Sequence, residues 1–215
     1  MRLAVERGKF ITLEGLEGVG KTTNREVIES LLEARAIEFI ATREPGGTQL
    51  GEELRKLVLH EHDQMAARTE LLLMAASRIE HVAQVIEPAL AVGQWVLCDR
   101  FLDASVAYQG AGRNLGTDTV LQLHKVVGMD LKPDLTLLLD MDVKDCLARM
   151  VARGKPDRIE REAHEFFERV RSAYLERAQQ DPHRVVVIDA AQPLDLVRRD
   201  VQSAVDALIA PIVCN

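Results

Sequence analysis

This chain has few cysteines, no excess of positive charge and no long apolar run. Its three cysteines are widely spaced without a C-x-x-C pattern, so neither a disulfide framework nor a zinc site is expected. The formal net charge of −7 argues against a nucleic-acid polymer as partner. No stretch is long and uncharged enough to span a bilayer, and residues 1–9 lack the apolar core of a signal peptide. We therefore expect a cytoplasmic protein without membrane or nucleic-acid partners.

Strand-like and helix-like patterns alternate along the 215 residues. Apolar runs predict strands near residues 10–14, 37–42, 95–98, 134–140 and 184–189. Helical periodicity predicts helices near residues 21–35, 48–59, 68–92, 103–109, 117–128, 143–153, 161–180 and 194–210. Such alternation is typical of a parallel sheet covered by helices, and Pro88 should bend the third helix or mark a junction. With no linker or repeat, one α/β domain over residues 1–215 is the simplest interpretation.

The first predicted strand leads directly into a phosphate-binding motif. Residues 15–22 read G-L-E-G-V-G-K-T, which fits the pattern G-x-x-x-x-G-K-[ST], and a helical pattern follows. Glycines in such a turn let backbone N–H groups surround a phosphate chain. Lys21 would supply charge for the β- and γ-phosphates, and the Thr22 hydroxyl can ligate Mg²⁺. The predicted nucleoside triphosphate site comprises Gly15, Leu16, Glu17, Gly18, Val19, Gly20, Lys21, Thr22 and Thr23.

A charged pair ends the strand predicted at residues 95–98. Asp99 can hold Mg²⁺ or its waters beside the phosphate loop, and Arg100 can bind a second phosphate bidentately. A structural ion pair is the alternative interpretation. The loops at residues 42–48 and 153–158 should also lie at the carboxyl edge of the sheet, where open α/β folds bind ligands.

Two helical segments carry side chains suited to a nucleobase. Arg78 lies four residues after Met74 on the apolar helix 68–92, where its donors must be used by a base carbonyl, a phosphate or a helix-capping ion pair. Ser105, Tyr108 and Gln109 share one helix face that combines hydrogen-bonding groups with a ring. A half-exposed helix explains that face equally well. The helix 68–92 is apolar around most of its circumference, which suggests a homodimer interface.

The segment 149–161 is strongly basic, whereas the phosphate loop contains no arginine. Its basic residues are Arg149, Arg153, Lys155, Arg158 and Arg161. Phosphoryl transfer spreads negative charge over the equatorial oxygens, and one arginine there can contribute about 10³–10⁵ in rate. We predict a lid over residues 149–161 that closes on the triphosphate and excludes water. A solvated charged face is the alternative.

Together these motifs resemble the bacterial thymidylate kinases, within the P-loop nucleoside monophosphate kinases, over essentially the whole chain. The resemblance is carried by residues 14–23, by T-R-E-P-G-G-T at 42–48, by D-R-F at 99–101 and by A-Y-Q-G at 107–110. It implies a three-layer P-loop fold with a five-stranded parallel sheet and a short lid. It also implies transfer of the γ-phosphoryl group of Mg-ATP to dTMP, which yields dTDP for dTTP biosynthesis.

The resemblance implies roles for individual residues. Glu17 would face the sugar 3′-hydroxyl, Arg78 the O4 edge of thymine, and Tyr108 the deoxyribose. The implied dTMP site comprises Glu44, Pro45, Arg55, Met74, Arg78, Arg100, Ser105, Tyr108 and Gln109. The implied catalytic residues are Lys21, Arg100, Arg153, Arg158 and Glu17, with Arg153 the first choice for the lid arginine and Arg158 the second. Met74 stands where many relatives carry a phenylalanine that stacks on thymine, so stacking should be softer here.

Three other functions are considered. A deoxynucleoside kinase would need a carboxylate base for a neutral 5′-hydroxyl, and Glu44 is a candidate for that role. A nucleotide-dependent switch of the GTPase kind needs an N-K-x-D motif, which does not occur in the sequence. A catalytically silent nucleotide-binding module disagrees with the presence of both arginine sets.

Overall fold

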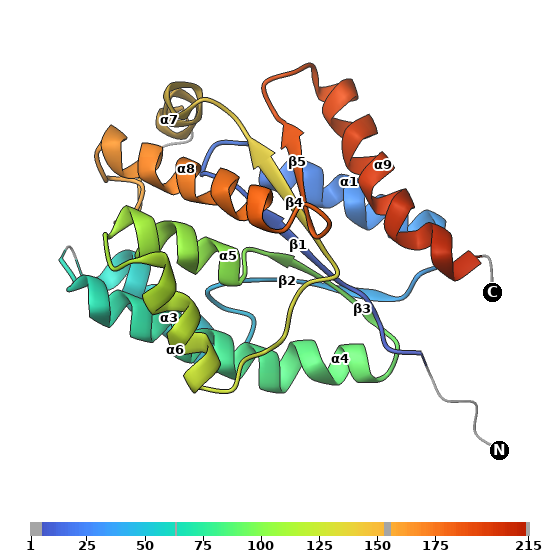
Figure 1. Cartoon of the computed structure of the whole chain (residues 1–215), viewed down its shortest axis with the longest axis horizontal. Coiled ribbons are helices and arrows are strands. Elements are labelled where there is room, and N and C mark those ends of the chain that lie inside the picture. The colour runs from blue at the N-terminus through green and yellow to red at the C-terminus, as the bar shows by residue number, and fades with distance from the viewer. Residues whose placement is uncertain (1–5, 63, 153–155, 214–215) are drawn as a thin grey trace.

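The computed structural model describes residues 6–62, 64–152 and 156–213, which contain a five-stranded parallel sheet. The strands are β1 (Phe10–Glu14), β2 (Phe39–Arg43), β3 (Trp95–Asp99), β4 (Leu135–Asp140) and β5 (Val185–Asp189). Their order across the sheet is β2-β3-β1-β4-β5, and all neighbouring pairs are parallel. Figure 1 shows the sheet between helices on both sides. The predicted three-layer α/β architecture is confirmed.

The helices follow the predicted segments closely. They are α1 (Lys21–Ala34), α2 (Gln49–Lys56), α3 (Ala67–His81), α4 (Glu87–Ala91), α5 (Leu102–Ser105), α6 (Thr117–Val126), α7 (Val143–Val151), α8 (His164–Gln180) and α9 (Leu194–Val213). Three π-helical turns extend α2, α3 and α5, namely η1 (Leu57–Glu61), η2 (Val82–Ile86) and η3 (Val106–Gly112). The turn η2 lies just before Pro88, which has no N–H to donate to the preceding helical turn. The predicted junction at Pro88 is therefore present.

Both faces of the sheet are covered by buried side chains, and one of them also buries a carboxylate. Ile11 and Leu13 of β1 belong to an apolar cluster that also contains Ile28 and Leu32 of α1. Because neighbouring strand residues point to opposite faces, Glu14 lies on the other face, where its carboxylate accepts a hydrogen bond from Tyr174 of α8. In Figure 1, α1 and α9 lie side by side at one side of the sheet, and α4 lies at the other. None of the described helices is long and apolar enough to cross a membrane.

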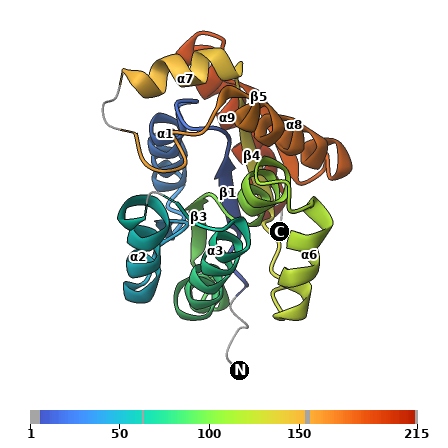
Figure 2. The same ribbon diagram turned by 90° about the vertical axis from the view of Figure 1, so that its left-hand side faces the viewer.

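Backbone hydrogen bonds link the loops at the carboxyl edge of the sheet. The Glu44 N–H donates to the Asp99 carbonyl at 2.9 Å, which joins the loop after β2 to the end of β3. The Arg100 N–H donates to the Leu13 carbonyl at 3.0 Å, which joins the loop after β3 to β1. Glu44, Asp99 and Arg100 are thereby held beside the phosphate loop that follows β1. In Figure 2 the loops at this end of the sheet face the viewer, with α2, α3, α6 and α7 around them.

Candidate active site

A cavity of about 520 Å³ opens at the carboxyl ends of β1, β2 and β3. Fourteen residues expected from the sequence line it, namely Glu17, Gly18, Gly20, Lys21, Thr22, Thr23, Glu44, Pro45, Arg55, Met74, Asp99, Arg100, Tyr108 and Gln109. Leu59, Ala104, Arg149, Asp157, Ile159 and Glu160 complete the lining. The phosphate loop and most of the predicted acceptor residues therefore share one cavity.

The phosphate loop has the geometry of an anion site. Gly18 has a φ of +80°, and a Cβ there would lie 2.4 Å from the Cys146 carbonyl oxygen, so only glycine fits. Gly20 caps the N-terminus of α1 in the left-handed region, and Lys21 donates from Nζ to the Leu16 carbonyl at 2.9 Å. Burial and the positive charge of Arg100 lower the pKa of Lys21 to about 8. Nearby carboxylates such as Asp99 and Glu17 oppose this shift without cancelling it, so a bound phosphate would further favour the ammonium form.

Leu16 and Val19, which the sequence places in the same site, have buried side chains in the apolar cluster. They can therefore offer a phosphate only their backbone groups, as can Gly15.

The two predicted magnesium ligands both line the cavity. Asp99 ends β3, and its buried Oδ1 has no hydrogen-bond partner among the described residues. Thr22 lies in the first turn of α1. A carboxylate oxygen left without a partner beside a hydroxyl and a phosphate loop fits Mg²⁺, which takes few protein ligands and completes its shell with phosphates and water. No group of three or more acidic, cysteine or histidine residues forms a metal centre in the part of the chain that is described.

Arg100 connects the phosphate loop to the acceptor side of the cavity. Its φ of +71° is rare for a residue with a side chain and directs the guanidinium into a cluster of polar groups. Arg100 Nη2 donates to Glu17 Oε1 at 2.6 Å and to the Tyr108 hydroxyl at 3.0 Å, and Nη1 donates to the Tyr174 hydroxyl. Burial alone would raise the pKa of Glu17, but the charges of Arg100 and Lys21 outweigh it and hold that pKa below the usual value.

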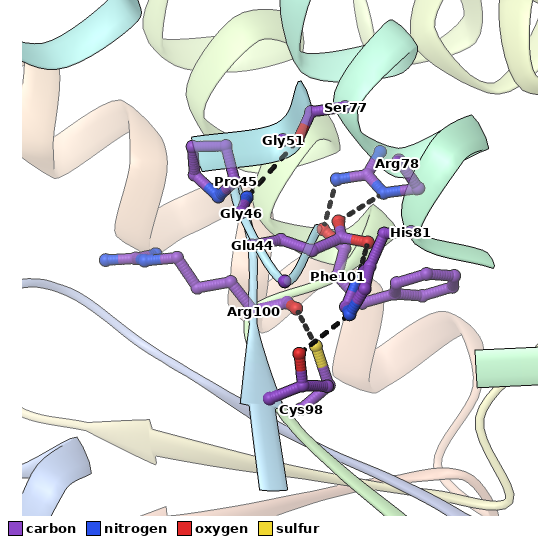
Figure 3. Close-up of polar contacts among 12 residues, drawn as sticks. Glu44, Pro45, Gly46, Gly51, Ser77, Arg78, His81, Cys98, Arg100 and Phe101 are labelled. Carbon is purple, nitrogen blue, oxygen red and sulfur yellow. Dashed lines mark hydrogen bonds and ion pairs between the residues drawn. The ribbon is translucent and has the colours of Figure 1, made fainter. Parts of the chain in front are cut away.

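Arg78 lies in a buried network outside the residues that line the cavity. It donates from Nε to Glu44 Oε2 at 2.6 Å and from Nη2 to the Phe101 carbonyl and the Ser105 hydroxyl. Figure 3 shows Arg78 turned toward Glu44, while Arg100 points the opposite way. Its Nη1 donates to Nε2 of His124, whose pKa is lowered to about 4 by burial and by the charge of Arg78.

Four of the five N–H groups of Arg78 are therefore used within the protein. One N–H group is left for the direct contact with thymine that the resemblance implies, and that contact stays a prediction. The pair with Glu44 joins a helix to the loop after β2, so it is an ion pair but not the helix-capping one that the residues alone left open. Ser105, fully buried against Arg78, also lies outside the cavity lining.

The arginines of the basic segment 149–161 also differ in whether they line the cavity. Arg149 of α7 lines the cavity and is exposed. Arg158 is buried, and it donates to the Val58 carbonyl at 2.7 Å and to Glu70 Oε2 at 2.7 Å. Two N–H groups of Arg158 are therefore used outside the cavity lining, and its role as a lid arginine stays a prediction. Arg153, the first choice for that role, lies outside the described residues.

Sequence reasoning missed several members of the buried networks, among them Glu70 and His124. Each of these two lies on a predicted helix without a motif around it, so only the tertiary contacts show their positions. The cavity-lining acids Asp157 and Glu160 lie in the predicted lid 149–161, where the sequence drew attention to the basic residues alone.

The phosphate loop after β1, the parallel sheet and an acid–arginine pair after β3 define a P-loop phosphotransferase. The sequence matches the thymidylate kinase family over residues 13–201. Among curated proteins, it is 54% identical over 195 residues to the thymidylate kinase of Methylobacillus flagellatus, covering 91% of this chain and 95% of that protein. It is 52% identical over 205 residues to the thymidylate kinase of Pseudomonas putida, with coverage of 95% and 97%.

Among solved structures, the thymidylate kinase of Ehrlichia chaffeensis superimposes with a TM-score of 0.76 at 33% identity, covering 93% of this chain and 99% of that one. The chain belongs to the thymidylate kinase family. It is a kinase that phosphorylates dTMP, as its resemblance to that family implied.

Proposed function

We propose that the described cavity carries out transfer of the γ-phosphoryl group of ATP to the phosphate of dTMP. The observation that supports this placement is that the phosphate loop and most of the side chains expected to hold dTMP, all but Arg78 and Ser105, line one cavity. Phosphoryl transfer depends mainly on positioning and on neutralising charge, and a shared cavity with several cationic groups provides both.

The donor phosphates lie on residues 15–23, with Lys21 as the principal positive charge. Thr22 and Asp99 hold Mg²⁺, directly or through water. When bound, the ion neutralises phosphate charge and fixes the phosphate geometry. The unpartnered Oδ1 of Asp99 supports this assignment, because a buried carboxylate oxygen is costly without a ligand or hydrogen bond.

The acceptor phosphate lies against Arg55 and Arg100, beside Glu44 and Pro45. Arg55 Nη1 donates to the Pro45 carbonyl at 2.9 Å, so its other donors are available to the cavity. The acceptor oxygen of dTMP is already anionic near neutral pH, so no general base is required. The base lies near Met74 and Gln109, and the sugar lies near Tyr108 and Glu17.

We further propose that residues 1–215 form one domain whose segment 149–161 closes over the triphosphate. Within this segment, Arg149 is the described arginine that lines the cavity, and it is exposed, so it can reach the transferred phosphate. Arg153 remains the sequence-based candidate.

We also propose a homodimer through the helix predicted at residues 68–92, in a cytoplasmic setting. Leu72 and Ile79 are 57% and 40% exposed and are seven residues apart, so they lie on one face of α3. The two described cysteines, Cys98 and Cys146, are buried and free, which suits a reducing compartment. Light scattering of wild type and Leu72→Glu tests the dimer, which should dissociate in the variant.

An acceptor screen tests the proposed function. ATP labelled in the γ-phosphate is offered with Mg²⁺ to dTMP, dUMP, dCMP, dGMP and thymidine. Label should pass to dTMP in preference to the other monophosphates, and not to thymidine. Preferred labelling of thymidine would instead indicate a deoxynucleoside kinase that uses Glu44 as its base.

A further inference from the structure

Glu70 of α3 is a fully buried carboxylate that contacts three side chains from two segments of the chain. Its Oε1 accepts from Gln109 Nε2 of η3 at 2.8 Å, and its Oε2 accepts from Arg158 Nη2 at 2.7 Å. Arg113, which follows η3, donates from Nε to Oε2 at 3.1 Å. Arg113 also pairs with Glu162, which sits just before α8. Glu70 is therefore held in one orientation from several directions.

The charge of Glu70 decides how the Gln109 amide is turned. Burial alone would raise the pKa of Glu70, but the hydrogen bond from Gln109 and the charges of Arg113 and Arg158 outweigh it and keep this pKa below its usual value. An ionised carboxylate can only accept hydrogen bonds, so it must face the NH₂ group of Gln109 and not its oxygen. The amide orientation thus follows from chemistry and not from an arbitrary choice between nitrogen and oxygen.

Within the described part of the chain, the oxygen of Gln109 is left as an unpartnered acceptor on a side chain that lines the cavity. This oxygen, Oε1, is buried. A buried acceptor without a partner favours a ligand that brings a donor. Thymine carries an N–H donor at N3, whereas cytosine carries an acceptor at the same ring position. An amide fixed with its oxygen toward the base can therefore form a hydrogen bond with thymine. With cytosine it would place two acceptors against each other.

We propose that Glu70 is a positioning residue that sets the thymine preference of the acceptor site by fixing the orientation of the Gln109 amide. The proposal rests on the placement of the base against Gln109 that is part of the proposed function. Glu70 itself touches no substrate. Its effect should therefore appear as a change in the choice between two acceptors more than as a change in the rate of phosphoryl transfer.

The experiment compares kcat/KM for dTMP and dCMP in the full chain. Glu70→Gln can present either an oxygen or an NH₂ group to Gln109, so the Gln109 amide becomes free to turn. The dTMP-to-dCMP ratio of kcat/KM should fall about tenfold, the factor expected for one hydrogen bond. Most of this fall should come from KM for dTMP, with kcat less affected.

Two control variants separate orientation from general damage. Glu70→Asp keeps a carboxylate that can only accept, so it should keep the wild-type ratio even where its KM values change. Glu162→Gln removes the other carboxylate on Arg113 without any contact to Gln109, and it should also keep the ratio. A ratio that falls equally in Glu70→Gln and Glu162→Gln would overturn the proposal, because loss of charge near Arg113 would then explain it.

Gln109→Leu distinguishes this inference from the proposed function. If Gln109→Leu lowers the ratio and Glu70→Gln does not, the base lies at Gln109 but Glu70 does not orient it, and only the inference fails. If Gln109→Leu leaves the ratio unchanged, the base is not recognised by Gln109, and the proposed placement of dTMP fails with it.

A second design applies if Glu70→Gln does not fold. Replacing the whole cluster by Glu70→Leu, Arg113→Met and Arg158→Met leaves no buried charge without a partner, and such replacements are often tolerated. The measured quantity is a ratio of two acceptors in the same protein, so a lower kcat from the loss of Arg158 cancels. The ratio should fall as in Glu70→Gln, and an unchanged ratio would refute the role of Glu70.

Discussion

Arg78 and Glu44 form a fully buried ion pair in which Nε of the arginine donates to Oε2 of the carboxylate at 2.6 Å. Glu44 follows β2, whereas Arg78 lies on α3, so the pair fixes the loop after β2 against that helix. His81, one turn further along α3, donates from Nδ1 to the other oxygen of Glu44 at 3.1 Å. The pair shapes one wall of the cavity, since Glu44 and Pro45 line it and Arg78 lies behind them.

Removing Arg78 should therefore first affect stability. Arg78→Met leaves Glu44 buried with one partner fewer, and breaking a buried pair in this way costs about 3–5 kcal/mol. Urea unfolding of the variant measures this loss. The double variant Glu44→Gln with Arg78→Met should recover part of it, because no uncompensated charge remains. Unchanged stability together with a specific loss of dTMP over dCMP would show instead that Arg78 contacts the base directly.

Lys21 should act on the reaction and not on the fold. Lys21→Met removes the buried ammonium of the phosphate loop while keeping the volume of the side chain. Loss of one positioned charge at a transferring phosphoryl group should lower kcat by about 10²–10³. Because the charged form of this lysine is already penalised by burial, the melting temperature should stay the same or rise. An unaltered kcat would contradict the assigned role.

The architecture could be predicted from the sequence because every strand is a short apolar run between helical patterns. Each strand begins within two residues of the predicted position, as with Phe39 in place of residue 37 in β2. The π-helical turns could not be predicted, since the same residues fit an α-helical period. The turn η3, for example, places Gln109 in a segment expected to be regular helix.

The candidate site could be predicted where a local motif fixes the backbone, and less well where long-range contacts decide. The phosphate loop, Asp99 and Arg100 line the cavity because they follow directly from strand ends. Arg78 lies among apolar residues of its predicted helix, so it must find a polar partner. The sequence does not reveal which partner that is. Glu44 and His124 lie 34 and 46 residues away, so only the fold brings them to it.

Substitutions of the arginines in the segment 149–161 should differ in whether they lower kcat or stability, according to where each side chain lies. Arg149→Met should lower kcat, because this side chain lines the cavity, and should leave the melting temperature nearly unchanged. Arg158→Met should lower the free energy of unfolding by about 1.5–3 kcal/mol, the value of a hydrogen bond to a charged group, and affect kcat less. The same two quantities, kcat and the free energy of unfolding, are measured for Arg153→Met, because Arg153 is the first choice for the lid arginine. Loss of kcat in Arg158→Met at unchanged stability would indicate that Arg158 reaches the triphosphate when the segment closes.

A pH-dependent stability should originate at Glu14, the last residue of β1. Its carboxyl group is fully buried, accepts from the Phe101 N–H at 2.8 Å and from the Tyr174 hydroxyl at 2.7 Å, and faces the charged groups of Asp103 and Arg100. Burial and the negative charge of Asp103 raise its pKa from 4.5 to about 7, although Arg100 and the two hydrogen bonds oppose this. The folded protein therefore holds a proton at Glu14 at pH values where the unfolded chain has released it.

The sign of the effect follows from this difference in bound protons. The contribution of Glu14 is fully present below pH 4.5 and is lost as pH rises to 7, where the folded carboxyl group also ionises. The total loss is about 3 kcal/mol, from about 1.4 kcal/mol per pH unit. Urea unfolding at pH 5, 6, 7 and 8 should show wild type losing stability relative to Glu14→Gln, which stays neutral throughout. The other titrating groups are common to both proteins and cancel in the difference. Parallel stability curves for the two would mean that Glu14 is ionised in the folded protein across this range, held so by Arg100.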